Sequence, residues 1–270
     1  VIHMAAQPLV RRSYQDPLET FSTNVMGTAH VLEAVRATPG VGAVLVVTSD
    51  KCYRNDGRTR GYVEEDALGG SDPYSASKAA CEIVVGSYLA TDWLGAGGPA
   101  LASARAGNVI GGGDWAVDRL VPDVMRAALG GLPLVVRYPE AVRPWQHVLD
   151  CLHGYVLLCE RLIETPADAR GAWNFGPDPG GAQTVGELLN RLASRWGEPL
   201  HVERPATAQP PEARYLHLDS TKARRALGWA PRFAFDDTLD SIVAWYRACQ
   251  RGGDVAALSR QQIQEFQDRT

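Results

Sequence analysis

A short run of apolar, mostly β-branched residues at 42–47 lies between two stretches with helical spacing of apolar residues. The first of these stretches starts at Pro17, and the second covers residues 72–92. Two further strand-like runs, at 1–6 and 100–106, complete an alternation of strands and helices. A continuous apolar strand is usually covered on both faces, and such alternation is typical of right-handed βαβ units. The sequence therefore predicts an α/β fold built on a parallel sheet.

The composition is that of a globular chain large enough to bury a substantial core. Of the 270 residues, 45% are hydrophobic and 21% are charged, and the formal net charge is -4. This balance gives no reason to expect nucleic acid or an anionic membrane surface as a partner. No apolar run approaches the ~18 residues that a membrane-spanning helix needs. We therefore expect neither nucleic acid nor a membrane as a partner.

The five cysteines are odd in number and contain no Cys-x-x-Cys. A reduced, cytoplasmic protein is the simplest interpretation of this usage. His147, Cys151 and His153 have a spacing that could suggest a metal site. No second group of ligands accompanies them, and the local pattern indicates an amphipathic helix, so we expect no metal.

The segment 72–78, with the sequence DPYSASK, predicts the start of a helix, because Asp is a favourable N-cap and Pro is common at the first helical position. Tyr74 and Lys78 are four residues apart and share one face of that helix. A nearby ammonium favours the phenolate, which makes Tyr74 a candidate proton-transfer group. With nine Tyr and three Lys, this spacing is expected by chance only roughly 0.1 times. The alternative is an exposed Tyr and a solvated Lys on an ordinary helix.

Polar loops follow the three predicted strands, at Gln7, at 48–51 and at 107–115. Ligands of parallel sheets bind outside the carboxyl ends of the strands. We therefore expect a site at this edge, beside the helix that carries Tyr74. Beyond residue 120 the pattern is looser, and the polar tail after 252–253 is expected to dock only weakly. Helices are also predicted at 148–164, 184–196 and 238–250.

Seven motifs, in this order and at these separations, resemble those of the nucleotide-sugar 4,6-dehydratases of the extended short-chain dehydrogenase/reductase superfamily. They are HMAAQ at 3–7, NVMGT at 24–28, TSDK at 48–51, the Tyr74/Lys78 pair, RAGNV at 105–109, RPWQHV at 143–148 and WNFG at 173–176. The dTDP-glucose enzymes of that group typically carry Asp-Glu after Thr-Ser. Asp50-Lys51, together with GGGDW at 111–115, instead resembles the CDP-glucose 4,6-dehydratases.

The resemblance implies an internal redox cycle with NAD that yields a 4-keto-6-deoxy sugar. Tyr74, assisted by Thr48, would take the proton of the sugar C4 hydroxyl. Lys51 would be the base at C5, and Asp50 the acid that protonates the departing C6 hydroxyl. The pKa of an ordinary Lys lies near ~10.4, so this role requires Lys51 to have a lowered pKa and Asp50 a raised one. The alternative for this pair is a salt-bridged surface turn.

By the same resemblance, cofactor contacts are expected from Ala5, Ala6, Asn24, Thr48, Tyr74 and Lys78, with Lys78 holding the nicotinamide ribose. Asn108 should contact the substrate. The planar guanidinium suits pyrophosphate oxygens, and the candidates for that contact are Arg119, Arg143 and Arg214. Each Arg could equally be an ordinary surface residue in a chain with 24 of them. The resemblance also implies a homodimer or homotetramer, paired through the helices that follow Pro17 and Asp72.

The resemblance further implies a Rossmann-type domain at 1–125, with a probable return of the chain at 143–177, and a smaller, mainly substrate-binding domain at 126–270. A Rossmann domain holds the dinucleotide through a glycine-rich turn, yet neither G-x-G-x-x-G nor G-x-x-G-x-x-G occurs in the sequence. We expect a fragment whose sheet is incomplete, lacking roughly the first 80 residues. Such a fragment should expose a strand edge and apolar helix faces, keep most of the chemistry and lose most of its hold on NAD.

Other functions stay open at this point. The nearest alternatives are a dehydratase for dTDP-glucose or GDP-mannose and a 4-epimerase on the same scaffold. A different class is a non-catalytic Rossmann protein that senses nucleotides, which need not keep Tyr74 or the Asp50-Lys51 pair. NAD rather than NADP is expected from the resemblance alone.

Overall fold

The computed structural model describes residues 1–91, 98–178, 182–207 and 215–269, which form two compact units. The first unit consists of Val1–Gly107, Leu152–Gly176 and His217–Ala230. The second consists of Asn108–Cys151, Pro177–Leu216 and Pro231–Thr270. The first long segment of the first unit thus ends at Gly107, whereas the sequence had placed a boundary near residue 125. The cofactor and substrate roles of the two parts stay predictions.

A parallel four-stranded sheet forms the centre of the first unit. Its strand order is β1 (Ile2–His3), β2 (Ala43–Val47), β3 (Ala100–Ala106) and β8 (Gly171–Phe175). The first four residues of β2 are buried, as a strand covered on both faces requires. The predicted α/β fold with a parallel sheet is therefore confirmed. Among the described residues β1 pairs only with β2, so it lies at an edge.

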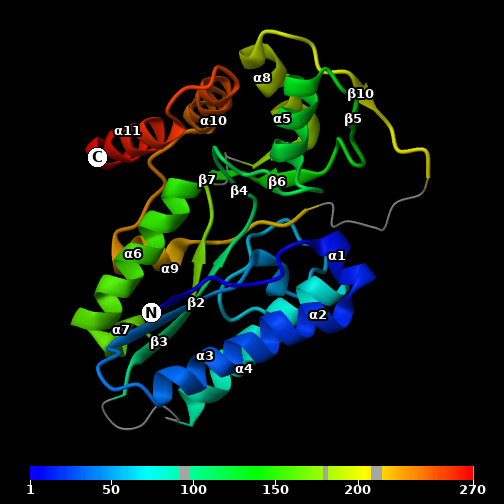
Figure 1. The fold of residues 1–270 in the computed structure, drawn as a ribbon. Helices are drawn as coiled ribbons and strands as arrows, with labels where there is room; N and C mark the ends of the chain where they lie inside the picture. Colours follow the sequence, from blue (N-terminus) through cyan, green and yellow to red (C-terminus); the bar gives the residue numbers. More distant parts are fainter. Residues whose placement is uncertain (92–97, 179–181, 208–214, 270) are drawn as a thin grey trace. The chain divides into compact units, whose positions relative to one another are not determined.

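Two helices lie side by side along this sheet (Figure 1), α3 (Gly27–Arg36) and α4 (Pro73–Ala90). The apolar cluster between them and the sheet consists of Leu32, Val35, Val44, Val46, Val85 and Leu101. The predicted start of α4 is confirmed, because the Asp72 carboxylate accepts a hydrogen bond from the Ser75 N–H at 2.9 Å. This cap fixes where the first turn of α4 begins, and with it the position of Tyr74.

The segment before α3 differs from the single helix that the sequence predicted. It consists of α2 (Pro17–Phe21), the π-helical turn η1 (Ser22–Met26) and then α3, and a short helix α1 (Val10–Gln15) replaces part of the predicted loop. Side chains compete for the carbonyl of Asn24, which accepts from Thr28 Oγ1 at 2.7 Å and from Cys81 Sγ at 3.1 Å. Such π-turns occur often at functional sites.

The chain leaves the first unit after Gly107 and rejoins it at Leu152, before the last strand of the sheet. Helix α6 (Val148–Glu164) has the predicted bounds, and α7 (Pro166–Ala169) connects it to β8. Gly154 permits the close approach of Phe175, because a Cβ there would lie 2.4 Å from that ring. Helix α9 (Thr221–Leu227) ends at Gly228, whose φ of 66° lies in the left-handed region.

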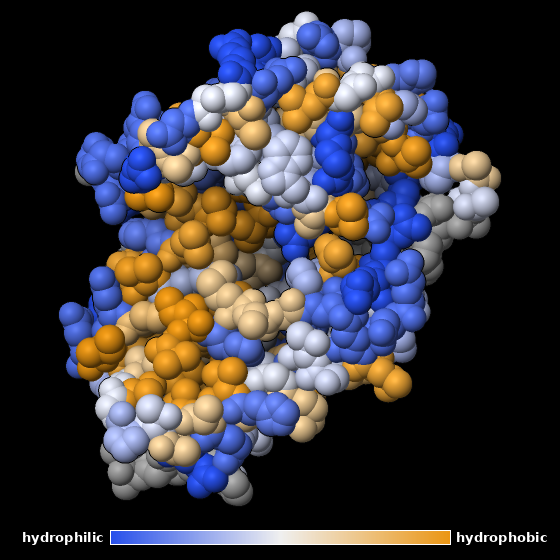
Figure 2. All heavy atoms as spheres, viewed as in Figure 1, coloured by the Kyte–Doolittle hydropathy of each residue, from blue (hydrophilic) through white to orange (hydrophobic). Residues whose placement is uncertain are grey.

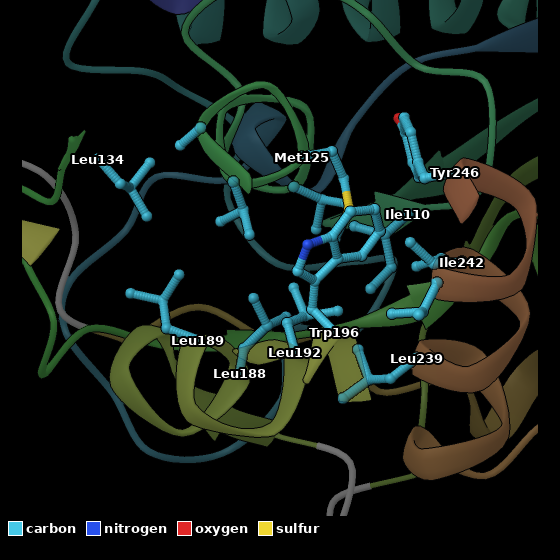
Figure 3. Close-up of a cluster of buried hydrophobic side chains, with 14 of the residues drawn as sticks. Ile110, Met125, Leu134, Leu188, Leu189, Leu192, Trp196, Leu239, Ile242 and Tyr246 are labelled. Carbon is cyan, nitrogen blue, oxygen red and sulfur yellow. The ribbon is translucent and has the colours of Figure 1, made fainter. Parts of the chain in front are cut away.

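In its described residues, the second unit has three short strand pairs and an apolar core to which three of its helices contribute. The pairs are β4 (Val109–Ile110) with β7 (Gln146–His147), β5 (Leu134–Val135) with β10 (Val202–Glu203), and β6 (Val142–Pro144) with β9 (Ala182–Thr184). The helices are α5 (Leu120–Gly130), α8 (Val185–Trp196) and α10 (Phe235–Gln250). Figure 3 shows their apolar side chains converging around Trp196 and Met125. We call this cluster the second-unit core.

The tail after residue 253 does not dock weakly, so that expectation was wrong. It forms α11 (Val255–Asp268), which contacts α10. Phe266 is 4% exposed, and its ring lies 5.5 Å from that of Phe233. Arg269 also makes an ion pair with Asp237 at 2.9 Å. Together with hydrogen bonds such as that from Gln262 Nε2 to the carbonyl of Ser241 at 2.9 Å, these contacts hold a helix whose polar composition suggested little contact.

Apolar side chains gather on part of the visible surface of the first unit (Figure 2). Val1, Ile2 and Met4, in or beside the edge strand β1, are 56%, 46% and 54% exposed. Ile163 of α6 is 67% exposed. The expectation of an exposed strand edge and apolar helix faces is met by these residues. Among the described residues, no helix has the length and hydropathy needed to cross a bilayer.

Candidate active site

The candidate catalytic residues gather at the carboxyl end of β2. Thr48 follows this strand directly, and its N–H donates to the carbonyl of Ala104 in β3 at 2.8 Å. The chain then enters the 3₁₀ turn η2 (Asp50–Cys52), which Ser49 caps by accepting from the Lys51 N–H at 3.2 Å. The turn packs against α4. The sheet edge named from the sequence therefore carries these side chains.

Tyr74 and Lys78 lie one turn apart on α4, and both side chains are buried. Tyr74 is 8% exposed and Lys78 is 6% exposed. The ammonium of Lys78 donates to the carbonyl of Val47, the last residue of β2, at 3.2 Å. Burial lowers the pKa of Lys78, although the nearby Cys81, Glu82 and Cys52 act in the opposite direction. The alternative, an exposed Tyr and a solvated Lys on an ordinary helix, therefore does not apply.

Glu82 is the next residue on this face of α4, and sequence reasoning missed it. Its carboxylate accepts from the hydroxyl of Thr48 and, at 2.7 Å, from the hydroxyl of Ser103. It also forms an ion pair with Arg105 at 2.8 Å, in which the side chains of Arg105 and Glu82 are only 4% and 3% exposed. The available signal was the continued four-residue spacing of Tyr74, Lys78 and Glu82 along one helix face.

Arg105 extends these contacts toward β8. Its guanidinium donates to Tyr53 Oη at 2.6 Å and to the carbonyl of Glu64 at 2.9 Å, and Tyr53 Oη donates to Asn174 Oδ1 at 2.8 Å. We call the connected side chains the strand-end network; they are Thr48, Glu82, Ser103, Arg105, Tyr53 and Asn174. Burial raises the pKa of Tyr53, with Arg105 opposing. Burial alone would lower the pKa of Arg105, but Glu82 outweighs it, so that pKa is raised.

Asp50 is buried at the start of η2, with an exposed fraction of 2%. The hydroxyl of Ser49 donates to its Oδ1 at 3.0 Å. Its Oδ2 lies so close to the backbone of Gly107 that a Cβ at that position would be 1.8 Å away. Residue 107 must therefore be glycine if Asp50 is to keep this position. Lys51 is half-buried, so only the acidic member of the pair is fully enclosed.

Asn24 joins the loop after β1 to α4. Its Oδ1 accepts from the Gln7 N–H at 2.8 Å, and its Nδ2 donates to Ser77 Oγ at 2.9 Å. The side chain is 1% exposed. Ala5 and Ala6, which precede Gln7, are exposed and half-buried. The π-turn thus fixes the loop that contains two of the predicted cofactor contacts.

Three of the four candidate substrate residues, Asn108, Arg119 and Arg143, are described, and all three belong to the second unit. Asn108 has a φ of 48°, in the left-handed region that few residues besides Gly and Asn adopt. Arg119 forms a half-exposed ion pair with Asp114 at 3.0 Å, and Arg143 donates to the carbonyl of Val142 at 2.9 Å. Arg214 lies outside the described residues. The roles of all four in substrate binding stay predictions.

The described parts of the chain hold no group of three or more His, Cys, Asp or Glu side chains that could bind a metal ion. The imidazole of His147 instead meets the ring of Phe233 at 4.6 Å and accepts from the Leu149 N–H at 3.2 Å. Burial, helped by Arg269, lowers the pKa of His147 to about 4.

Fold and site together define a Rossmann-type α/β protein of the extended short-chain dehydrogenase/reductase kind, with a Tyr-x-x-x-Lys pair beside the strand ends. The model of the GDP-mannose 4,6 dehydratase family matches residues 1–242. The chain therefore belongs to the GDP-mannose 4,6-dehydratase family.

Known proteins similar to this chain include several sugar-nucleotide dehydratases. A CDP-glucose 4,6-dehydratase of Salmonella typhimurium is 44% identical over 274 residues, which cover 100% of this chain and 76% of that protein. A dTDP-glucose 4,6-dehydratase of Streptomyces griseus is 31% identical, covering 91% and 71%. The structure of the dTDP-glucose 4,6-dehydratase DesIV from Streptomyces venezuelae, with NAD and TYD bound, superposes with a TM-score of 0.79 at 28% identity, covering 94% and 74%.

Proposed function

We propose that the protein is a hydro-lyase that dehydrates CDP-glucose to CDP-4-keto-6-deoxyglucose with bound NAD. The observation that carries this proposal is the buried Asp50 carboxyl, set against Gly107 beside Lys51 and two residues beyond Thr48. An acid and a base at one strand end suit an elimination, which needs one proton removed and another delivered. The 44% identity to the Salmonella CDP-glucose enzyme supports the choice of nucleotide.

The described side chains fit the nicotinamide end of NAD. Tyr74 and Lys78 are buried on one face of α4, and both carry donors that suit ribose hydroxyls. Asn24 fixes the loop with Ala5 and Ala6, whose small side chains leave room for a planar ring. These residues, with Thr48, would hold the nicotinamide ribose. When bound, NAD supplies the acceptor for the hydride from sugar C4 and returns that hydride to C6.

The first proton transfer falls to Tyr74 and Thr48. Tyr74 takes the proton of the C4 hydroxyl, and Thr48 orients that hydroxyl by a hydrogen bond. In this proposal the ammonium of Lys78, one helical turn from Tyr74 on α4, favours the phenolate form that this step requires. Loss of this proton together with the hydride leaves a ketone at C4.

The elimination falls to Lys51 and Asp50. The C4 ketone acidifies the C5 hydrogen, which Lys51 removes as a proton. Asp50 gives its proton to the C6 hydroxyl, which departs as water. Once C6 receives the hydride, Lys51 returns a proton to C5. Tyr74 releases to solvent the proton it took from the C4 hydroxyl, and Asp50 takes up one from solvent, so the only net change is the loss of one water. Burial of Asp50 keeps bulk water away from the carboxyl that delivers the proton.

The second unit supplies the contacts to the nucleotide sugar in this proposal. Asn108 contacts the sugar, and the guanidinium groups of Arg119 and Arg143 bind the pyrophosphate. The proposal also includes a homodimer or homotetramer, paired through α2 and α4, since Leu18 and Ile83 on these helices are 80% and 63% exposed. All five cysteines are free thiols, which supports a cytoplasmic location.

A panel of sugar nucleotides tests the proposal. The protein, supplied with NAD+ in large excess because a weak hold on NAD is expected, should convert CDP-glucose to a product lighter by one water. This product should show a 4-keto-6-deoxy sugar by NMR. Turnover of dTDP-glucose or GDP-mannose alone would reject the choice of nucleotide, and interconversion of 4-epimers would reject dehydration. A protein that binds sugar nucleotides without turnover would be a sensor.

Tyr74→Phe tests the site itself. Removal of the phenol should lower kcat by about 10²- to 10⁴-fold, because the C4 proton loses its acceptor. The matched control is Tyr88→Phe on the same helix, whose hydroxyl contacts Glu33 Oε1 at 2.7 Å, and this variant should keep full activity. Full activity of Tyr74→Phe would overturn the mechanism.

A further inference from the structure

The hydroxyl of Thr48 has two described hydrogen-bond contacts, and both are with acceptors. One is the Glu82 carboxylate, and the other is the carbonyl of Ala104 at 3.4 Å. A hydroxyl carries one hydrogen and two lone pairs, whereas a carboxylate only accepts. The single hydrogen of Thr48 is therefore committed within the protein. Toward a bound molecule, this hydroxyl can only accept.

The orientation of Glu82 is fixed by its other contacts. Arg105 Nη2 and Ser103 Oγ both donate to Oε2, at 2.8 and 2.7 Å. The remaining oxygen, Oε1, takes the hydrogen of Thr48. Charge-assisted bonds of this kind are short and strongly oriented, and all three partners of Glu82 are buried. The carboxylate thus presents one fixed acceptor to the residue that ends β2.

We infer that Glu82 is a positioning residue that makes Thr48 an obligate hydrogen-bond acceptor in the active site. The inference rests on the proposed function, in which Thr48 meets the C4 hydroxyl and Tyr74. Thr48 accepts from that hydroxyl, or from the phenol of Tyr74 once it has taken the proton. Thr48 does not donate a hydrogen bond to the phenolate. Such a bond would stabilise the phenolate and so weaken Tyr74 as a base. Glu82 therefore completes the face of α4 that carries Tyr74 and Lys78.

Glu82→Gln tests this inference by reversing one hydrogen bond. Arg105 and Ser103 demand an oxygen on their side, so the Gln amide must present its NH2 group to Thr48. The hydroxyl of Thr48 can then donate its hydrogen bond to a group in the active site. We expect kcat per folded molecule to fall by about 10- to 100-fold, with KM for CDP-glucose little changed. The unfolding temperature should also fall, because the buried guanidinium of Arg105 loses its charged partner. The acid limb of the kcat–pH profile should move to lower pH, because Thr48 now donates to the phenolate.

Two further variants separate positioning from general damage. Ser103→Ala removes another donor to the same carboxylate but leaves the bond to Thr48, so kcat should stay at the wild-type value. In a Thr48→Val background, Glu82→Gln should cause no further loss, since the hydroxyl through which it acts is gone. The inference would be overturned if Glu82→Gln lowered kcat as much in the Thr48→Val background as in the wild type. It would also be overturned if Ser103→Ala lowered kcat as much as Glu82→Gln does.

A second readout needs neither cofactor nor turnover. A hydroxyl hydrogen bonded to a buried carboxylate exchanges slowly with water, so the Thr48 hydroxyl proton should give an NMR signal in threonine-labelled protein. That signal should vanish in Glu82→Gln and persist in Ser103→Ala. Its absence from the wild-type protein would contradict the inference whether or not the protein dehydrates CDP-glucose. A wild-type protein that shows the signal but no turnover would count against the proposed function alone.

Discussion

The strand-end network of the first unit and the second-unit core are both buried, but they are held by different forces. The network contains a charged pair, Glu82 and Arg105, whose carboxylate and guanidinium each have several directed partners. The core consists almost wholly of apolar side chains, such as Met125 and Leu192, both 0% exposed. Directed bonds specify the position of each atom, whereas apolar packing mainly specifies volume. We therefore expect loss of a charged group from the network to damage both stability and chemistry, and truncation in the core to damage stability alone.

Arg105→Met should produce the largest effect, because it leaves the Glu82 carboxylate buried without its ion-pair partner. Breaking a buried pair typically costs about 3–5 kcal/mol of stability. The matched control is Arg36→Met, which breaks the exposed pair with Glu33 and should cost at most about 1 kcal/mol. Thermal and denaturant unfolding of both variants measures the difference. Equal costs would show that the network contributes no more than a surface pair.

Leu192→Ala should damage the second-unit core while sparing the chemistry. The side chain is fully buried in α8, so truncation should cost about 2–5 kcal/mol through lost burial and a residual cavity. Leu192→Met keeps most of the volume and should cost less than about 1.5 kcal/mol. The activity of the folded fraction should match the wild type in both variants. A large fall in kcat per folded molecule would break the contrast between the two regions.

Gly107→Ala should reduce activity with little loss of stability. The new Cβ would lie 1.8 Å from Asp50 Oδ2, so the carboxyl must move. A misplacement of about 1 Å can lower kcat by about 100-fold. Gly86→Ala in α4 is the control, because a Cβ there meets nothing within 4 Å and alanine favours the helix. Wild-type kcat in Gly107→Ala would show that the position of Asp50 does not matter.

Asp150→Asn should produce the smallest effect, and this effect should develop between about pH 4 and pH 6. Burial raises the pKa of Asp150 from 3.8 to about 6, so the folded protein holds this proton more tightly than the unfolded chain. Its ionisation therefore costs stability progressively between about pH 4 and pH 6. His147 acts in the opposite sense, because burial lowers its pKa to about 4. In the wild-type curve of stability against pH, the contributions of Asp150 and His147 therefore partly cancel.

The informative quantity is the difference in unfolding free energy between Asp150→Asn and the wild type. The amide oxygen can still accept from the Arg232 N–H, which contacts Asp150 at 2.6 Å. The variant should gain about 1–2 kcal/mol relative to the wild type between pH 4 and pH 6, and no more above that range. Calorimetry across this range measures the gain. A difference that does not vary with pH would contradict the raised pKa.

Local chemistry made much of this structure predictable. Asp72 and Pro73 marked the start of α4, and Thr184 with Glu187 forms the capping box of α8. The parallel sheet followed from strand and helix alternation. These features depend on residues a few positions apart, so a sequence displays them directly.

Contacts between distant residues were not predictable in this way. Thr48 and Glu82 are 34 positions apart, and neither spacing nor composition reveals their hydrogen bond. The π-turn at Asn24 also escaped prediction, since apolar periodicity over two turns scarcely changes when one residue is added. Gly107 stood out as part of a motif, but its physical reason, the approach of Asp50, needed coordinates.

In this account, the side chains at the carboxyl end of β2 act with Tyr74 and bound NAD. Together they oxidise C4, eliminate water across C5 and C6, and place a hydrogen on C6. CDP-glucose labelled with deuterium at C4 tests this claim most directly. After incubation in ordinary water, the product should carry that deuterium on its C6 methyl group, as read by NMR. Deuterium retained at C4, or a dehydrated product without deuterium at C6, would contradict the account.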